Sequence, residues 1–345
     1  MAPVGLIKDD IFMNHITSDF HPEHPERLKA IYSLLEDKKI QQQSSVLQAR
    51  EALPQELAWI HTESYIQKIE STKGCRHQQL DPDTAVSAET YRIAKLAAGG
   101  LFVLIDALYN EQISSGFALI RPPGHHAEAD RGMGFCIYNN VAIAARYAQQ
   151  KGYAKKILII DWDLHHGNGT QHSFESDPTV LYFSSHQFPY YPGTGRVEEV
   201  GRGEGKGFTV NVPLPGGQGD GDFIEIYQKT IVPIADQFQP DLLLISAGFD
   251  TYNRDPLGGM DVTESGFAQL ARLLKQVADT HCQGRILLTL EGGYHTGGLA
   301  RSVKEVIHAL YGEQAEETAD LSPASDTAKQ IIDYVQKVQG TYWQF

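Results

Sequence analysis

Short apolar runs alternate with longer amphipathic stretches from about residue 84 onward. The short runs are rich in β-branched and aromatic residues and are mostly apolar throughout, as expected of strands buried on both faces. They predict strands over 117–120, 157–160, 179–183, 208–212, 242–246 and 286–290. The stretches between them predict helices over 85–109, 140–151, 222–238, 263–281 and 298–311. This alternation predicts an α/β fold with a mostly parallel sheet covered by helices on both faces.

The length and continuity of the chain favour one domain. Its 345 residues can bury a full core and fit one large α/β domain. The Gly- and Pro-rich stretch 191–221 contains one of the predicted strands, so we interpret it as a loop region and not as a linker. A polar stretch from residue 312 precedes a short amphipathic segment. We therefore predict a single domain over 1–345, with a helical C-terminal extension over 312–345.

Composition narrows the class of partner. The formal net charge of -14 argues against nucleic acid and favours cationic substrates such as lysine side chains or polyamines, although the charge can also serve solubility alone. Three scattered cysteines do not form a disulfide framework or a cysteine-based zinc site, which fits a reducing compartment. We find no signal-peptide pattern and no apolar run of about 18 residues. These features predict a cytoplasmic protein without a membrane partner.

Polar residues of catalytic type follow five of the six predicted strands. In chain order, these residues are His125 and His126; Asp161, Asp163 and His165; Ser184 and Ser185; Asp250; and Glu291 with Tyr294. In open α/β sheets, ligands bind at the carboxyl ends of the strands. Residues spread over about 170 positions are therefore expected to converge on one crevice.

The segment Asp161-Trp-Asp163-Leu-His165 carries the metal prediction. Positions i, i+2 and i+4 of an extended strand point the same way, and buried carboxylates are costly unless a cation or hydrogen-bond donors compensate. A salt-bridged strand end is the structural alternative. Asp250 follows another buried strand, and two carboxylates with one histidine leave a fourth position open, as in catalytic zinc sites. A binuclear manganese site is the other possibility, since oxygen ligands suit harder metals.

The tandem His125-His126 lies in a loop bounded by Gly and Pro, with Asp161 and Asn168 available as polar partners. We interpret the pair as oriented acid and base groups, although single histidines are more often structural. Tyr294 follows Gly292-Gly293 on a turn that can bring its phenol close to a substrate. The alternative for Tyr294 alone is a half-buried loop aromatic.

Seven motifs, RPPGHH, GFCIYNN, DWDLHHGNGT, PGTG, ISAGFD, DPLGG and EGGY, occur in the order found in the histone deacetylase family, which the chain resembles over about 14–311. That family includes bacterial histone deacetylase-like amidohydrolases and acetylpolyamine amidohydrolases. Asn168 stands where class I members carry Asp, so the chain is similar to class II. The resemblance implies an arginase/deacetylase-like fold, a single domain with an eight-stranded sheet.

The resemblance also implies roles for individual residues. Asp163, His165 and Asp250 would bind one zinc ion. His126, oriented by Asn168, would act as general base and then general acid. His125, paired with Asp161, would stay positive, and Tyr294 would donate a hydrogen bond to the oxyanion. A donor of this kind is worth roughly 10²–10³ in rate.

The family binds its substrate in an aromatic tunnel and holds potassium near the zinc. The implied substrate-binding residues are Gly134, Phe135, Tyr191, Leu257, Gly293 and Arg27. Tyr191 replaces the usual Phe, and Arg27 matches an arginine near the acetate exit. One implied potassium site uses Asp161, Asp163, His165, Ser184 and Ser185, and a second uses the backbone carbonyls of Phe174, Asp177, Val180 and Phe208.

We therefore expect a zinc-dependent deacetylase that acts on N-acetyl-lysine in peptides or proteins. Polyamine-selective relatives carry Glu at the position of Leu257, so an acetylpolyamine is the second choice, with acidic residues at 81–83 or 19–26 able to supply the missing carboxylate. An arginase-type ureohydrolase would use two manganese ions, but this chain has no Asp two residues after His165. A catalytically inactive binding module is the alternative outside enzymes.

Overall fold

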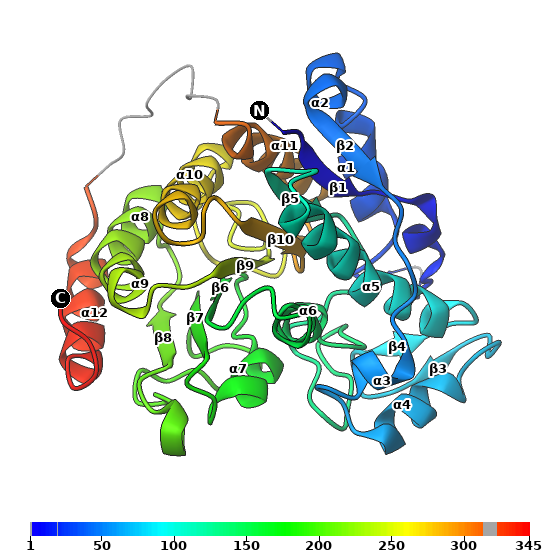
Figure 1. Cartoon of the computed structure of the whole chain (residues 1–345), viewed down its shortest axis with the longest axis horizontal. Coiled ribbons are helices and arrows are strands. Elements are labelled where there is room, and N and C mark those ends of the chain that lie inside the picture. Colours follow the sequence, from blue (N-terminus) through cyan, green and yellow to red (C-terminus); the bar gives the residue numbers. More distant parts are fainter. Residues whose placement is uncertain (1, 19, 313–322) are drawn as a thin grey trace.

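The computed structural model of the chain describes residues 2–18, 20–312 and 323–345. In these residues, a central sheet lies between two layers of helices (Figure 1). Its eight strands are β1 (Val4–Ile7), β2 (Ser44–Leu47), β5 (Ser115–Ala118), β6 (Ile157–Asp161), β7 (Val180–Gln187), β8 (Thr209–Leu214), β9 (Leu242–Ala247) and β10 (Ile286–Leu290). The predicted eight-stranded α/β fold is confirmed.

The sheet has the order β2-β1-β5-β10-β9-β6-β7-β8. Every neighbouring pair in it is parallel, so all eight carboxyl ends lie along the same edge. The six predicted strands are β5 to β10, and the two weaker strands are β1 and β2. A separate antiparallel pair, β3 (Gln78–Gln79) and β4 (Ala85–Val86), was not predicted.

One layer of helices contains α1 (Glu26–Leu34), α8 (Asp220–Lys229), α9 (Ile231–Phe238), α10 (Glu264–His281) and α11 (Thr296–Leu310), and the other contains α5 (Thr90–Tyr109), α6 (Asn140–Gln150) and α7 (Asn168–Phe174). The remaining helices are η1 (Asp10–Asn14), α2 (Lys38–Gln43), α3 (Pro54–Leu57), α4 (Glu63–Glu70), η2 (Gly203–Gly205) and α12 (Asp326–Gln339). Strands β5, β6, β9 and β10 are buried along their whole length, which explains their uninterrupted apolar sequences.

Two predicted helices differ from the observed ones. The helix predicted over 85–109 begins only at Thr90, because the Thr90 hydroxyl accepts a hydrogen bond from Ser87 N at 2.8 Å and closes a turn. The helix predicted over 222–238 is divided into α8 and α9 at Thr230. Pro233 has no N–H to donate to the carbonyl of Lys229, and that carbonyl accepts instead from Gln336 Nε2 at 2.8 Å.

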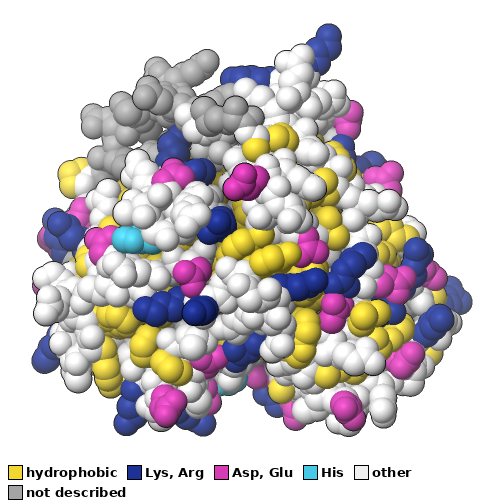
Figure 2. Space-filling view, in the orientation of Figure 1, with side chains coloured by type: hydrophobic (Ala, Val, Ile, Leu, Met, Phe, Trp, Pro, Cys, Tyr) yellow, Lys and Arg dark blue, Asp and Glu magenta, His cyan; other side chains and the backbone are white. Residues whose placement is uncertain are grey.

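The predicted C-terminal extension over 312–345 contains α12, which packs on β8 and α8. Residues 313–322 of that extension lie outside the described part of the chain, as does Asp19. Figure 2 shows basic and acidic side chains interspersed over the face seen there, with hydrophobic side chains in small groups between them. No helix in the described ranges combines the length and apolarity needed to cross a bilayer.

Candidate active site

Three potential metal ligands meet where strands β6 and β9 end. Asp163 and His165 follow β6, and Asp250 follows β9, its neighbour in the sheet. One ligand atom from each residue lies within 4.8 Å of the other two, and all three residues are buried. His165 Nδ1 lies 3.2 Å from Asp163 Oδ1 and 3.0 Å from Asp250 Oδ2. The structure thus brings together the three residues that the sequence assigns to zinc.

Backbone groups approach both carboxylates of this cluster and fix their orientation. Gly292 N donates to Asp163 Oδ2 at 2.8 Å, and Leu164 N donates to Asp250 Oδ1 at 2.8 Å. A Cβ atom on Gly292 would collide with the Asp250 carboxylate and lie 2.6 Å from Asp163 Oδ2. A Cβ atom on Gly248 would collide with the Asp163 carboxylate. Glycine at these two positions is what lets the backbone come so close.

The charges of the cluster suit a divalent cation. Burial, together with the negative charge of Asp163, raises the pKa of Asp250 to about 7, because the two carboxylates share a site from which water is excluded. A cation between them would offset this repulsion. Two carboxylates and one imidazole leave a fourth position for water or substrate, as in catalytic zinc sites. The donor set of Asp163, His165 and Asp250 therefore fits a zinc ion.

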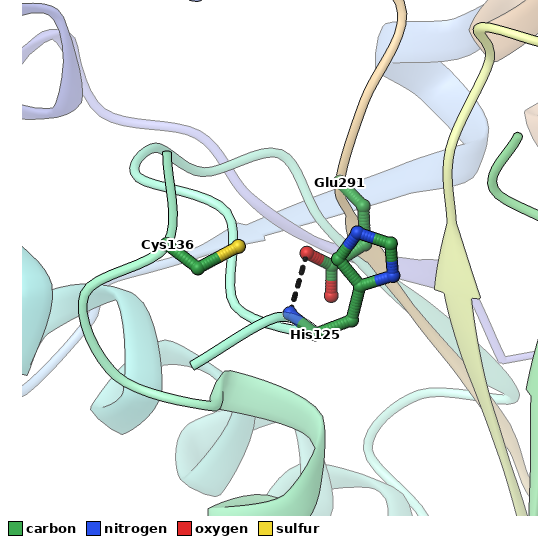
Figure 3. Close-up of side chains that lie close together, drawn as sticks. All are labelled: His125, Cys136 and Glu291. Atoms are coloured by element: carbon green, nitrogen blue, oxygen red, sulfur yellow. Dashed lines mark hydrogen bonds between the residues drawn. The ribbon is translucent and has the colours of Figure 1, made fainter. Parts of the chain in front are cut away.

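A second group of potential ligands consists of His125, Cys136 and Glu291 (Figure 3). Its polar groups already bond to the protein. Glu291 Oε2 accepts from the backbone nitrogens of Gly124 and His125 at 2.6 and 3.2 Å, and Cys136 Sγ donates to Gly134 O at 3.3 Å. Figure 3 shows the Glu291 carboxylate directly beside the His125 backbone nitrogen. We interpret this group as an anchor that fixes the histidine loop to the end of β10.

His125 is held as a cation. Its Nδ1 donates to Asp161 Oδ2 at 3.0 Å, and the hydroxyl of Tyr182 donates to the same oxygen at 3.0 Å. Burial opposes protonation, but the negative charges of Asp161 and Asp163 raise the pKa of His125 to about 10. The imidazole of His125 is therefore protonated at neutral pH.

His126, in contrast, is held neutral. Its Nδ1 donates to Asn168 Oδ1 at 2.8 Å, so the lone pair of the neutral ring lies on Nε2. Burial and the positive charges of His125 and His165 lower the pKa of His126 well below its usual value. The rings of His125 and His126 lie 4.0 Å apart between centroids, so one charged and one neutral imidazole stand side by side.

Tyr294 lies at the end of a turn that begins after β10. Its backbone nitrogen donates to Asp255 Oδ2 at 2.6 Å, and its ring meets the edge of Phe135 at 5.8 Å between centroids. Burial raises the pKa of the Tyr294 phenol well above its usual value. The phenol therefore keeps its proton at neutral pH and can donate a hydrogen bond.

His126, His165 and Tyr294 open into one cavity of about 310 Å³. Its lining residues are Asp83, His126, Gly134, Phe135, His165, Tyr190, Tyr191, Leu257 and Tyr294. Four of the six predicted substrate-binding residues are among them. The aromatic walls and the few polar groups at the base match the general character of a small-molecule site.

The turn that carries Gly134 and Phe135 has an unusual backbone. Both residues lie in the left-handed region, with φ of 57° at Gly134 and 69° at Phe135. Their backbone nitrogens donate to Asp83 Oδ1 at 3.0 Å and to Thr84 Oγ1 at 2.8 Å. A non-glycine residue in this region is strained, and such strain concentrates at functional sites. Here the strained turn directs the Phe135 ring into the cavity wall.

The other two predicted substrate-binding residues, Arg27 and Gly293, support the Tyr294 turn and do not line the cavity. Arg27 Nε donates to Gly293 O at 2.7 Å, and Arg27 Nη2 donates to Glu291 O at 2.5 Å. The Arg27 guanidinium lies 5.1 Å from the centroid of the Tyr294 ring, while Glu23 Oε1 accepts from Arg27 Nη1 at 3.0 Å. A contact between Arg27 and acetate stays a prediction.

The predicted potassium ligands also lie near one another in the fold. Asp161 on β6 and Ser184 on β7 are partners in the strand register, and Ser185 Oγ lies 2.9 Å from the Tyr227 hydroxyl. For the second set, Asp177 N donates to Phe174 O at 2.9 Å, Val180 N donates to Asp177 O at 3.3 Å, and Phe208 O accepts from Tyr182 N at 2.9 Å. Potassium binding at either site stays a prediction.

Two residues of the cavity wall had no place in the predicted site. Tyr190 donates through its hydroxyl to Leu257 O at 2.9 Å, and only its position next to Tyr191 could have indicated it. Asp83 was named only as one possible source of a carboxylate. It reaches the cavity through the turn between β3 and β4, two short strands that no hydrophobic pattern indicates.

A sequence model described as the histone deacetylase domain matches residues 21–310. Histone deacetylase 15 from Arabidopsis thaliana is 41% identical over 94% of this chain and 59% of its own length, and the polyamine deacetylase HDAC10 from Danio rerio is 37% identical over 93% and 49%. A probable deacetylase from Archaeoglobus fulgidus is 36% identical over 99% of this chain and 98% of its own. The chain thus belongs to the histone deacetylase family.

The solved structures agree with this assignment. The crystal structure of the HDA15 HD domain matches with a TM-score of 0.92 and 39% identity, over 99% of this chain and 95% of that one. The chain spans about half the length of the plant and fish relatives. The resemblance therefore covers their deacetylase region and not their whole length.

Proposed function

We propose that this chain is a zinc-dependent deacetylase that hydrolyses the amide of N-acetylated amines, N-acetyl-lysine in peptides or proteins above all, and releases acetate. The observation that carries this proposal is that candidate metal ligands and candidate acid and base groups meet at one aromatic cavity. His165 of the metal cluster and His126 both line this cavity, with their rings 5.9 Å apart between centroids, and Tyr294 lines it from another loop. Membership of the histone deacetylase family supports the same reaction class.

In this reaction, a water oxygen adds to the acyl carbon, the C–N bond breaks, and the leaving nitrogen takes a proton. Asp163, His165 and Asp250 would hold the zinc ion, which would supply Lewis-acid activation of the acyl carbonyl and lower the pKa of water to about 7. His126 Nε2 accepts the proton of the attacking water and delivers it to the amine, because Nδ1 is engaged by Asn168. The His125 cation and the Tyr294 phenol stabilise the negative charge that develops on the acyl oxygen.

The test of this function combines metal content with turnover. We expect about one zinc ion per chain, hydrolysis of an acetyl-lysine peptide, and strong inhibition by a hydroxamate, which offers two oxygens to the open zinc position. Asp250→Ala and His165→Ala should lose both metal and activity. Two manganese ions per chain, with hydrolysis of a guanidinium substrate, would instead indicate the ureohydrolase. The presence of Gly167 two residues after His165, where that class needs Asp, argues against it.

Two side chains at the cavity favour different substrates. Leu257 offers only apolar surface, which suits the alkyl stem of a lysine and gives a second ammonium no partner. Asp83 lines the same cavity with a carboxylate, and this observation favours the second candidate, an acetylpolyamine. One oxygen of Asp83 already accepts from Gly134 N and Thr84 Oγ1, at 3.0 and 2.7 Å. We therefore give Leu257 the greater weight and propose acetyl-lysine.

The choice between these substrates is decided by kcat/KM for an acetyl-lysine peptide and for acetylated spermidine and putrescine at 0.15 M salt, where charges beyond about 8 Å are screened. We expect the peptide to be the better substrate and Leu257→Glu to shift selectivity toward polyamines. A tenfold preference of the parent protein for acetylpolyamine, lost in Asp83→Asn, would overturn the acetyl-lysine assignment.

A further inference from the structure

The contact between His126 and Asn168 is the first of three consecutive hydrogen bonds. His126 Nδ1 lies 2.8 Å from Asn168 Oδ1, and Asn168 Nδ2 donates to Glu128 Oε1 at 2.6 Å. His172 Nδ1 then lies 2.8 and 3.0 Å from the two oxygens of Glu128. His126, Asn168 and Glu128 are buried, whereas the side chain of His172 is 38% exposed. The series thus runs from the cavity to the surface.

Two structural elements hold this series in place. His126 and Glu128 belong to the loop that follows β5, and Asn168 and His172 lie one turn apart on α7, so both can reach the same carboxylate. Helix α7 packs tightly on the loop, because a Cβ atom on Gly169 would collide with Ala127 O. Burial opposes ionisation of Glu128, but the hydrogen bond from His172 and its charge lower the pKa of Glu128 below its usual value. The carboxylate is therefore ionised at neutral pH.

The Glu128 carboxylate dictates how the next two groups bond. An ionised carboxylate only accepts hydrogen bonds, so the Asn168 amide must turn its NH₂ group toward Glu128 and its oxygen toward His126. An amide oxygen also only accepts, so His126 must carry its proton on Nδ1. The lone pair of His126 is then on Nε2, the nitrogen that proton transfer requires. Asn168 Nδ2 also donates to His126 O, but at 3.4 Å that hydrogen bond is much longer than the one to Glu128. Loss of Glu128 would therefore remove the main constraint against a 180° rotation of the Asn168 amide, which would select the opposite tautomer.

We propose that Glu128 is a positioning residue for the reaction, which orients the Asn168 amide and so fixes the Nδ1–H tautomer of His126. This inference rests on the proposed function, in which His126 transfers the proton. Glu128 touches no reacting atom and acts through Asn168 alone. His172, one turn further along α7, holds the carboxylate in place from the surface side.

Charge reversal at position 128 gives a sharp test. In Glu128→Lys, the ammonium only donates, so Asn168 should turn its oxygen toward the lysine and its NH₂ group toward His126. A histidine base with its tautomer wrongly held costs a serine protease about 10⁴ in kcat, so we expect kcat to fall at least about 100-fold with KM within about threefold. Adding Asn168→Asp should restore kcat to within about tenfold of the parent, because a carboxylate accepts from both the lysine and His126.

The matched control is Asp130→Lys, which makes the same charge change at an exposed position of the same loop. It should keep kcat within about twofold, since surface substitutions of this kind have small effects. A readout independent of turnover is ¹⁵N NMR of the histidine rings, with His126→Gln used to assign the signals. We expect protonated Nδ1 in the parent protein and protonated Nε2 in Glu128→Lys.

The outcomes separate this inference from the proposed function. An unchanged tautomer of His126 in a folded Glu128→Lys protein would overturn the role of Glu128, even where the parent protein proves to be a deacetylase. A folded double variant no more active than Glu128→Lys would do the same. If the parent protein hydrolyses neither acetyl-lysine nor acetylpolyamine, the proposed function fails, while a tautomer that reverses in Glu128→Lys still supports the positioning role.

Discussion

The position of the Tyr294 hydroxyl is fixed from three directions. Asp255 Oδ2 accepts from the backbone nitrogens of Tyr294 and His295 at 2.6 and 3.0 Å, which holds the turn. The Arg27 guanidinium lies 5.1 Å from the centroid of the phenol ring, and the Phe135 ring packs nearly perpendicular to it at 5.8 Å between centroids. A donor held in this way needs little reorganisation when charge develops on the acyl oxygen.

Replacing Tyr294 by Phe should therefore separate catalysis from folding. The variant keeps the ring and its contacts with Arg27 and Phe135, and loses only the hydroxyl. We expect kcat to fall by roughly 10²-fold or more, with zinc content and melting temperature unchanged. Steady-state kinetics and elemental analysis of both proteins measure this, and near-normal turnover would show that the phenol is not the donor.

Residues of the site that follow a strand could be predicted, because parallel strands bring their carboxyl ends to one edge whatever their separation in sequence. Asp163, His165 and Asp250 were identified in this way, and the structure brings them within 4.8 Å. Glu128 follows no strand directly, and its importance depends on a contact with α7 that no local pattern reveals. The place of Tyr190 in the cavity wall likewise depends on the path of the loop after β7, which no local pattern reveals.

Some helices and strands could likewise be predicted from local sequence, whereas others depend on contacts between residues that are distant in sequence. Strands β5 to β10 and helices α5, α6, α10 and α11 could be predicted from the hydrophobic pattern, because the strands are mostly apolar throughout and each helix is amphipathic. The division between α8 and α9 depends on Pro233 and on the Gln336 side chain from α12, which is distant in sequence. Strand β2 is only partly buried and pairs parallel to β1 at the edge of the sheet, so its pairing defines it more than its composition does.

The glycine turn after β10 brings its backbone into the metal cluster, and this gives a prediction at the scale of elements. In Gly292→Ala, the added methyl group would collide with the Asp250 carboxylate and lie 2.6 Å from Asp163 Oδ2. We expect zinc affinity to fall by about 10-fold or more, as is typical when groups behind metal ligands are disturbed. A competition assay with a chromophoric chelator measures this affinity.

Gly297→Ala is the matched control for that experiment. Gly297 lies in the first turn of α11, five residues further along, and a Cβ atom there would meet nothing nearer than 3.4 Å. Alanine in a helix is more favourable than glycine, so zinc affinity should stay unchanged and stability should not fall. Equal zinc affinities in the two variants would mean that the turn does not shape the metal cluster.

At the scale of the molecule, a parallel sheet must protect its two edge strands from pairing with other chains. The edge strand β8 is covered by the segment that contains α12, which lies outside the matched histone deacetylase region of 21–310 (Figure 1). Gln339 Nε2 donates to Thr209 O at 2.8 Å, and Trp343 Nε1 donates to Gly207 O at 2.7 Å. These side chains satisfy two backbone carbonyl acceptors, one on β8 and one two residues before the strand begins.

Removal of residues 323–345 should destabilise the protein and expose this edge. Ala328, Ile332 and Val335 are buried in the contact of α12 with its neighbours, and burying a Val or Ile side chain contributes about 1.5–3 kcal/mol. We expect the free energy of unfolding to fall by on the order of 5 kcal/mol and self-association to increase, measured by urea denaturation and light scattering. Ile332→Ala should lower the free energy of unfolding by about 2–5 kcal/mol without exposing the edge of β8. Asp333 is exposed on the same helix, so Asp333→Ala should change the free energy of unfolding by less than about 0.5 kcal/mol. A shortened chain that is as stable and as monomeric as the parent would show that α12 does not protect β8.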